Sequence, residues 1–123
     1  MTPSDKNKNH FFFGLKGGDI KDIITILSQH PEVEEAYIFG SRAKNIYKNG
    51  SDVDIAVKGD ALNFNIVRHI SYLLNEETQM PNFFDVLNYH TINNKDLLDH
   101  IDRVGRLLYS KISSSKFIWA FPL

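Results

Sequence analysis

The sequence contains no cysteine, which excludes disulfide bonds and thiolate metal sites. It also lacks any hydrophobic stretch near the roughly 20 residues needed to cross a bilayer, and its first residues lack the apolar region of a signal peptide. The formal net charge is only −1, so no excess of positive charge attracts nucleic acid or an anionic membrane. We therefore expect a cytoplasmic protein that binds neither a membrane nor, directly, nucleic acid.

The chain is long enough for one small domain with a real core. It has 123 residues, of which 42% are hydrophobic and 24% are charged. A separate substrate domain would not fit. We expect a flexible N-terminal arm over residues 1–17, where no periodicity is sustained, and the folded domain over 18–112. Serines then precede an apolar C-terminal tail over 113–123, which packs on its own domain or on a partner.

The hydrophobic pattern predicts an α/β (α+β) fold, in which helices flank a small mixed sheet. Helical spacing of apolar residues is typical of three segments, and short β-branched or alternating runs are typical of three others. Asn93 is the expected N-cap of the last helix, whose apolar stripe includes Leu107 and Leu108. The helices are expected over 19–29, over 61–75 and from Asn93 to Leu108, and the strands over 34–40, 52–58 and 82–89.

Three aspartates are the candidate catalytic and metal-binding residues. Asp52 and Asp54 are two apart on one strand, so their side chains share a face and repel unless a cation lies between them or one pKa is raised. Asp85 lies within another apolar strand, where a charge is costly unless it is paired or bound to metal. Three carboxylates on one sheet surface could hold two Mg²⁺ ions about 3.5 to 4 Å apart, as in nucleotidyl transfer.

Gly40, Ser41 and Arg42 are the candidate nucleotide-binding residues. Gly40 ends a strand, where a backbone without Cβ lets a phosphate approach closely. Ser41 is expected to cap a short helical turn over 42–48, whose exposed N–H groups favour phosphate. The alternative interpretation of each motif is structural: an Asp-x-Asp pair is often a solvated turn or strand edge, and Asp85 could be a capped structural residue.

The segments "FGSRAKNIYKNGSDVDIAV" and "FFDVLNY" resemble the DNA-polymerase-β-like nucleotidyltransferases, over residues 18 to 110. The motif of that family is Gly-Ser, a ten-residue gap, Asp-x-Asp, and a third Asp on a following strand. The resemblance implies that Ser41 contacts the nucleotide phosphates and that Asp52 and Asp54 bind two Mg²⁺ ions. It further implies that Asp85 is the third ligand and helps to deprotonate the acceptor.

The short chain resembles the minimal nucleotidyltransferase branch of that superfamily. This resemblance implies a HEPN-domain toxin as partner, which the nucleotidyltransferase silences as an antitoxin by transferring AMP from ATP to a tyrosine. Members of the branch often have Gly where Asn45 stands in this sequence, and Asn tolerates a left-handed backbone better than most residues do.

Other functions remain open from the sequence. A non-catalytic antitoxin could neutralise a HEPN partner by occlusion, and transfer to a small molecule such as an aminoglycoside would suit larger relatives with an acceptor domain. Template-directed polymerisation is disfavoured, because neither the length nor a basic groove supports it. The nucleotide preference, the acceptor and the choice between homo-oligomer and hetero-oligomer stay undetermined.

Overall fold

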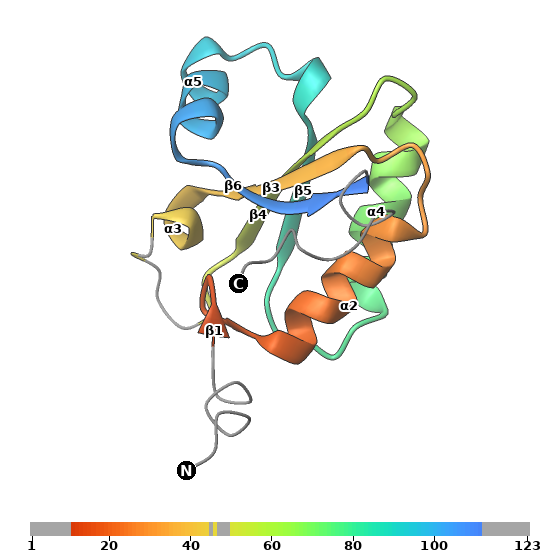
Figure 1. The fold of residues 1–123 in the computed structure, drawn as a ribbon, viewed down its shortest axis with the longest axis vertical. Coiled ribbons are helices and arrows are strands. Elements are labelled where there is room, and N and C mark those ends of the chain that lie inside the picture. Colours follow the sequence, from red (N-terminus) through yellow and green to blue (C-terminus); the bar gives the residue numbers. More distant parts are fainter. Residues whose placement is uncertain (1–10, 45, 47–49, 112–123) are drawn as a thin grey trace.

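The computed structural model describes residues 11–44, 46 and 50–111. Its centre is a mixed four-stranded sheet with the strand order β5-β4-β3-β6 (Figure 1). The pairs β3–β4 and β3–β6 are antiparallel, whereas β4 and β5 are parallel. The strands are β3 (Glu35–Phe39), β4 (Val53–Lys58), β5 (Phe84–Asn88) and β6 (Arg106–Ser110).

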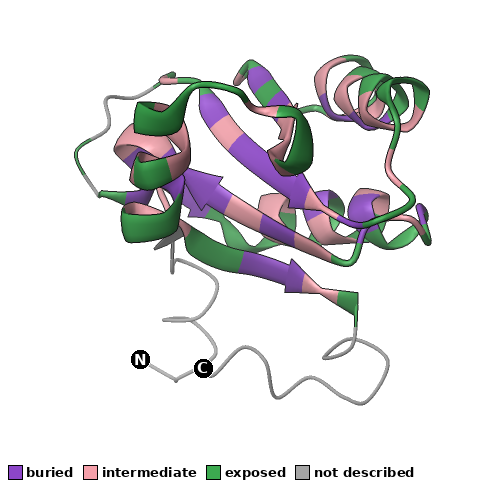
Figure 2. Cartoon of the chain, turned by 90° about the horizontal axis from the view of Figure 1, so that it is seen from above, coloured by how far each residue is buried: buried purple, intermediate pink, exposed green. Residues whose placement is uncertain are grey.

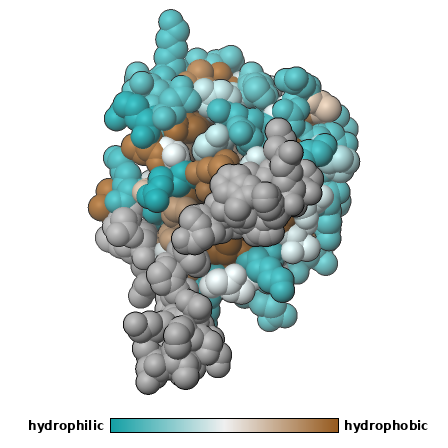
Figure 3. All heavy atoms as spheres, viewed as in Figure 1, coloured by the Kyte–Doolittle hydropathy of each residue, from teal (hydrophilic) through white to brown (hydrophobic). Residues whose placement is uncertain are grey.

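Helices cover both faces of this sheet, which confirms the predicted fold class. α2 (Gly17–Ser28) and α4 (Phe64–Glu76) pack on one face, and α5 (Lys95–Val104) packs on the other (Figure 1). A 3₁₀ turn, η1 (Tyr89–Thr91), follows β5. In the space-filling view, hydrophilic residues cover the outer side of α5 (Figure 3). None of the helices in the described part of the chain is long and apolar enough to cross a membrane.

Alternation along β4 divides its side chains between the two faces. Val53, Ile55 and Val57 are fully buried in the main core beneath α2 and α4. Ala56 belongs to a second cluster with Phe39 and Ile101, beneath α5. Buried residues therefore follow the strands in Figure 2, with less buried positions between them. Because Asp54 alternates with the core residues, it lies on the α5 face.

Most predicted elements are confirmed with shifts of a few residues at their ends. The helix expected over 61–75 is α4, and it begins after Asn63, whose side chain accepts a hydrogen bond of 2.9 Å from the Ile66 N–H. This is the N-cap geometry that fixes where a helix starts. The last helix begins after Asn94 rather than Asn93, because the Asn94 side chain accepts from the Leu97 N–H at 3.1 Å.

The prediction that Leu107 and Leu108 continue the last helix is wrong. α5 ends at Val104, and the Gly105 N–H closes it by donating to the Ile101 carbonyl at 2.8 Å. Leu107 and Leu108 then belong to β6, which pairs with the outer edge of β3. Leu108 is buried while Leu107 is exposed, as expected for a strand.

The structure departs from the expected loose arm at residues 11–16. There β1 (Phe11–Phe12) and β2 (Leu15–Lys16) form a short antiparallel hairpin. Its turn places Phe13 and Gly14 at positive φ, and Leu15 enters the main core. One inserted apolar side chain thus anchors the segment. The expected tail over 113–123 lies outside the described residues, as do residues 1–10.

Candidate active site

Asp54 and Asp85 stand opposite each other on neighbouring strands. They are register partners in the parallel pair β4–β5, and Asp52 lies directly before β4, two residues from Asp54. Asp54 is half-buried, whereas Asp52 and Asp85 are exposed. The sequence predicted three carboxylates on one sheet surface, and the pairing of β4 with β5 brings Asp85 beside Asp54. The three carboxylates therefore occupy the α5 face of the sheet, at the end where β4 and β5 begin.

Burial and negative charge act together on Asp54. Burial raises the pKa of its carboxyl above the ordinary value of 3.8, and the neighbouring Asp85 and Asp52 carboxylates raise it further. His100 and Arg42 lower the pKa and offset part of this effect. A cation bound between the carboxylates would relieve the repulsion that raises this pKa.

The donor chemistry of this cluster suits magnesium. Among the described residues, no group of three or more His, Asp or Glu side chains is arranged to hold a metal ion by itself. Magnesium usually takes only one or two protein carboxylates, and substrate phosphates and waters complete its octahedron. Asp54 and Asp85 are oxygen donors on adjacent strands, and the repulsion between them favours a bound cation. The residues present therefore fit a Mg²⁺ ion whose remaining ligands come from a triphosphate and water.

Gly40 is required because the Asp54 carboxylate lies against it. Gly40 has φ of 75°, and a Cβ added there would overlap Oδ2 of Asp54 and come within 3.3 Å of its Cγ. The sequence predicted close approach of a phosphate at this glycine, and the structure shows close approach of a carboxylate. The prediction that Ser41 caps the following turn is wrong: α3 (Gly40–Ala43) already begins at Gly40, and no side chain caps it.

His100 on α5 joins the site, although no sequence pattern indicated a role for it. Its Nε2 accepts a hydrogen bond of 3.3 Å from the Gly40 N–H. The imidazole also meets the ring of Phe39 edge-on, with 6.2 Å between centroids. Only the packing of α5 over the end of β3 creates these contacts. Local sequence therefore carries no signal for them.

Replacing His100 separates these two contacts. His100→Phe retains an aromatic ring against Phe39 but removes the acceptor for the Gly40 N–H, whereas His100→Gln retains an acceptor. We expect the phenylalanine variant to raise KM for the nucleotide about fivefold, the effect of one neutral hydrogen bond, and the glutamine variant to recover most of this loss. Steady-state kinetics with varied nucleotide would check it. Equal KM values in the two variants would show that the hydrogen bond between Gly40 and His100 does not affect nucleotide binding.

Arg42 is buried and supports the segment that carries Asp52. Its guanidinium donates to the carbonyl oxygens of Ser51 at 2.9 Å, Asp52 at 3.3 Å and Phe13 at 2.9 Å. Only 3% of the residue is exposed. These bonds tie the β1–β2 hairpin to the start of β4. They assign Arg42 a supporting role, and its predicted contact with nucleotide stays a prediction.

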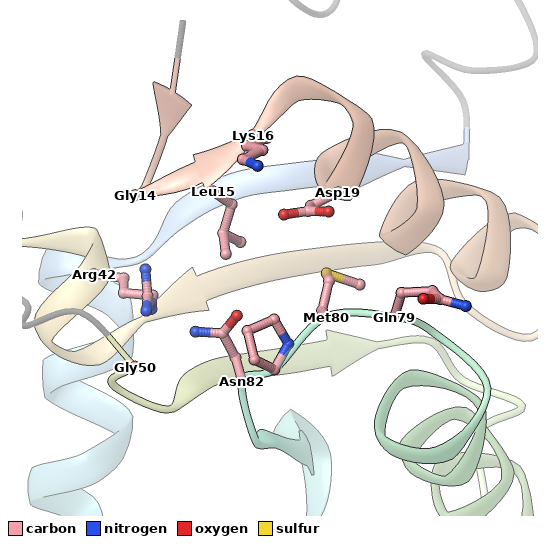
Figure 4. Close-up of a pocket in the computed structure, with 10 residues that line it drawn as sticks. Gly14, Leu15, Lys16, Asp19, Arg42, Gly50, Gln79, Met80 and Asn82 are labelled. Atoms are coloured by element: carbon pink, nitrogen blue, oxygen red, sulfur yellow. The ribbon is translucent and has the colours of Figure 1, made fainter. Parts of the chain in front are cut away.

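A pocket of about 310 Å³ lies beside Arg42, between the β1–β2 hairpin and the loop before β5 (Figure 4). Leu15 and Met80 line it, and both belong to the main core on the α2–α4 face. None of the three aspartates is among its lining residues. This hollow is therefore separate from the acidic cluster, which lies on the α5 face.

Comparison with known families matches residues 21–114 to the family model described as "Polymerase beta, Nucleotidyltransferase". This segment covers most of the chain and includes the Gly-Ser pair and all three aspartates. Comparison with curated protein sequences gives no significant match.

Several solved structures share the fold. One is a toxin–antitoxin crystal structure with AMP-PNP, with a TM-score of 0.63 and 21% identity over 79% of this chain and 77% of that chain. Another is the tri-AMPylated Shewanella oneidensis HEPN toxin in complex with the MNT antitoxin, with a TM-score of 0.58 and 20% identity over 80% and 75%. A third is the toxin–antitoxin MntA–HepT, with a TM-score of 0.60 and 19% identity over 82% and 78%. At identities this low, the comparisons establish a shared fold and nothing more specific.

Proposed function

The chain belongs to the polymerase beta nucleotidyltransferase family, and from this premise we propose that it transfers AMP from ATP to a hydroxyl acceptor with the help of Mg²⁺. The observation that carries the proposal is the register pairing of Asp54 with Asp85, beside Asp52 and against Gly40. Aspartates with a purely structural role are not expected in this arrangement. The arrangement raises the pKa of Asp54 and leaves the other two carboxylates exposed, which is typical of a functional site.

Each residue of the site then has a chemical task. Ser41, on the turn after Gly40, contacts the phosphates from the β3 side of Asp54. Asp52, Asp54 and Asp85 would hold two Mg²⁺ ions, which when bound would neutralise charge on the triphosphate and lower the pKa of the attacking hydroxyl. Asp85, on the exposed side, takes the hydroxyl proton. The acceptor oxygen bonds to the α-phosphorus, the bond from that phosphorus to the β-phosphate oxygen breaks, and pyrophosphate leaves.

The acceptor in this proposal is a tyrosine of a HEPN toxin, which the protein silences as an antitoxin. Two of the structural relatives support it, since one contains AMP-PNP and another contains an AMPylated HEPN toxin beside an MNT antitoxin. A protein acceptor also agrees with the openness of the site, because Asp52 and Asp85 are exposed to an approaching surface.

The decisive experiment incubates the purified protein with the product of the neighbouring gene and with ATP labelled in either the α-phosphate or the γ-phosphate. The partner should gain label from α-labelled ATP only, and only when Mg²⁺ is present. Tight binding of the partner without label transfer, tested with all four nucleoside triphosphates, would refute the enzymatic proposal and favour neutralisation by occlusion.

A further inference from the structure

We propose that Phe83 forms the acceptor-side contact of this site, where its ring packs against the phenol ring of the tyrosine that receives AMP. The inference rests on the proposed function and adds to it the residue that selects an aromatic acceptor. Three observations carry it: the face on which Phe83 lies, its exposure, and its position relative to the Gly40–Ser41 turn.

Phe83 lies on the same face of the sheet as the acidic cluster. The Val53 N–H donates to the Phe83 carbonyl at 2.9 Å, so strand pairing with β4 already includes this residue. Phe84 and Val86 point into the main core, and Leu87 packs in the cluster beneath α5. Alternation therefore places Phe83 on the α5 face together with Asp85. The printed register begins with Val53 beside Phe84, and extending it by one position puts Phe83 level with Asp52.

The Phe83 side chain is largely exposed to solvent. The residue is 56% exposed, although its neighbour Phe84 is fully buried. Asp85 and Asp52, which flank it along and across the strands, are also exposed. A large exposed ring in the same stretch as two exposed aspartates gains nothing for the core of the domain. It does offer a flat apolar surface directly beside the carboxylate that takes the acceptor proton.

The position of Phe83 favours the acceptor over the nucleotide. Gly40 and Ser41 follow β3, on one side of β4, while Asp85 lies on β5 and Phe83 directly before it, on the other side. Within the described residues, β5 is the end strand of the sheet, and no strand pairs with its outer edge. An acceptor that reaches Asp85 from this open edge passes the ring of Phe83. Aromatic rings prefer offset or edge-to-face contact with one another, which a phenol can make and an aliphatic hydroxyl cannot.

The test compares a phenolic with an aliphatic acceptor. Transfer of AMP from ATP to N-acetyl-tyrosinamide and to N-acetyl-serinamide would be measured for the wild type, Phe83→Ala and Phe83→Trp. We expect the alanine variant to lower kcat/KM for the tyrosine probe roughly fivefold to tenfold and the tryptophan variant to restore it. The serine probe and KM for ATP should change by less than about twofold, because neither depends on a ring at this position.

Phe64 provides the matched control. It is 75% exposed on α4, on the opposite face of the sheet, so Phe64→Ala makes the same chemical change away from the site. An equal effect of the two alanine variants, or an equal loss for both probes, would overturn the proposal. A raised KM for ATP in Phe83→Ala would do so as well, because the ring would then contact the nucleobase.

Binding distinguishes this inference from the proposed function. If the wild type transfers AMP to no acceptor, the proposed function fails, and saturation-transfer NMR of N-acetyl-tyrosinamide then decides the contact alone. A signal that is lost in Phe83→Ala and kept in Phe64→Ala supports the contact, whereas equal signals in both variants refute it.

Discussion

Asp54→Asn is expected to lower AMP transfer by roughly a hundredfold or more and, at neutral pH, to stabilise the fold. The loss of activity follows because the variant removes the half-buried carboxylate of the site, and deleting one electrostatic stabiliser of a transition state typically costs about 10² to 10³ in rate. The gain in stability follows because the same carboxylate is held next to two others. A site that gives up stability for activity is the usual compromise in enzymes.

The raised pKa of Asp54 fixes the sign of the pH dependence. The folded state holds the proton more tightly than the unfolded state, whose pKa is the ordinary 3.8. The free energy of unfolding therefore falls as pH rises from about the unfolded pKa through the raised folded pKa, and it stays lower above that window. Asparagine does not titrate, so this decline should be absent from the variant. Thermal unfolding of both proteins between pH 4 and 8 measures it.

Asp60→Asn serves as the control for charge removal. Asp60 is exposed in the loop after β4, at the opposite end of that strand from the three aspartates of the site. We expect it to leave both activity and the pH profile of stability unchanged. If Asp54→Asn were less stable than the wild type at pH 7 in a metal-free buffer, repulsion between the Asp54 carboxylate and its two neighbours could not be destabilising the fold.

Gly40→Ala should impair both stability and activity. Alanine at φ of 75° costs about 1 to 2 kcal/mol, and its Cβ would overlap the Asp54 carboxylate. The carboxylate must therefore move away from its position opposite Asp85. For a domain of this size we expect a fall in Tm of about 5 °C or more, with a loss of transfer approaching that of Asp54→Asn. Calorimetry and the label-transfer assay test the two effects separately.

Gly50→Ala isolates the contribution of the clash. Gly50 has φ of 81°, but nothing lies within 4 Å of the Cβ that alanine would add, so this variant has the backbone strain without the overlap. Gly40→Ala should exceed it in both effects. In an Asp54→Ala background the excess loss of stability should shrink, since the overlapping atoms are gone. An excess that persists there would mean that Gly40 is needed for a reason other than Asp54.

The central strands were predictable because their burial follows local alternation. Val53, Ile55 and Val57 face one core, and this pattern alone identified β4. The end of the last helix was not predictable in this way. Two adjacent leucines fit the stripe of a helix as well as they fit a strand, and pairing with the free edge of β3 decides between them. Leu15 likewise leaves the expected arm because a distant core accepts it.

The candidate site also has a part that local sequence predicts and a part that only the fold creates. The grouping of Asp52, Asp54 and Asp85 could be predicted because charged residues in apolar strands are conspicuous, and the register places two of them opposite each other. The support of the site could not be found. The sequence made Arg42 a candidate nucleotide-binding residue, whereas folding buries it against carbonyl oxygens. His100 contacts Gly40 although 60 residues separate them in the chain.

The parallel pairing of β4 with β5 has a practical consequence. Parallel neighbours cannot be joined by a tight turn, and here α4 crosses between them. Asp54 precedes that crossing and Asp85 follows it, so the two carboxylates belong to different halves of the chain. If the chain were cut between α4 and β5 and the two fragments were co-expressed, each fragment alone would be inactive. Their reassociation would restore catalysis, which makes the transfer reaction a reporter for fragment complementation.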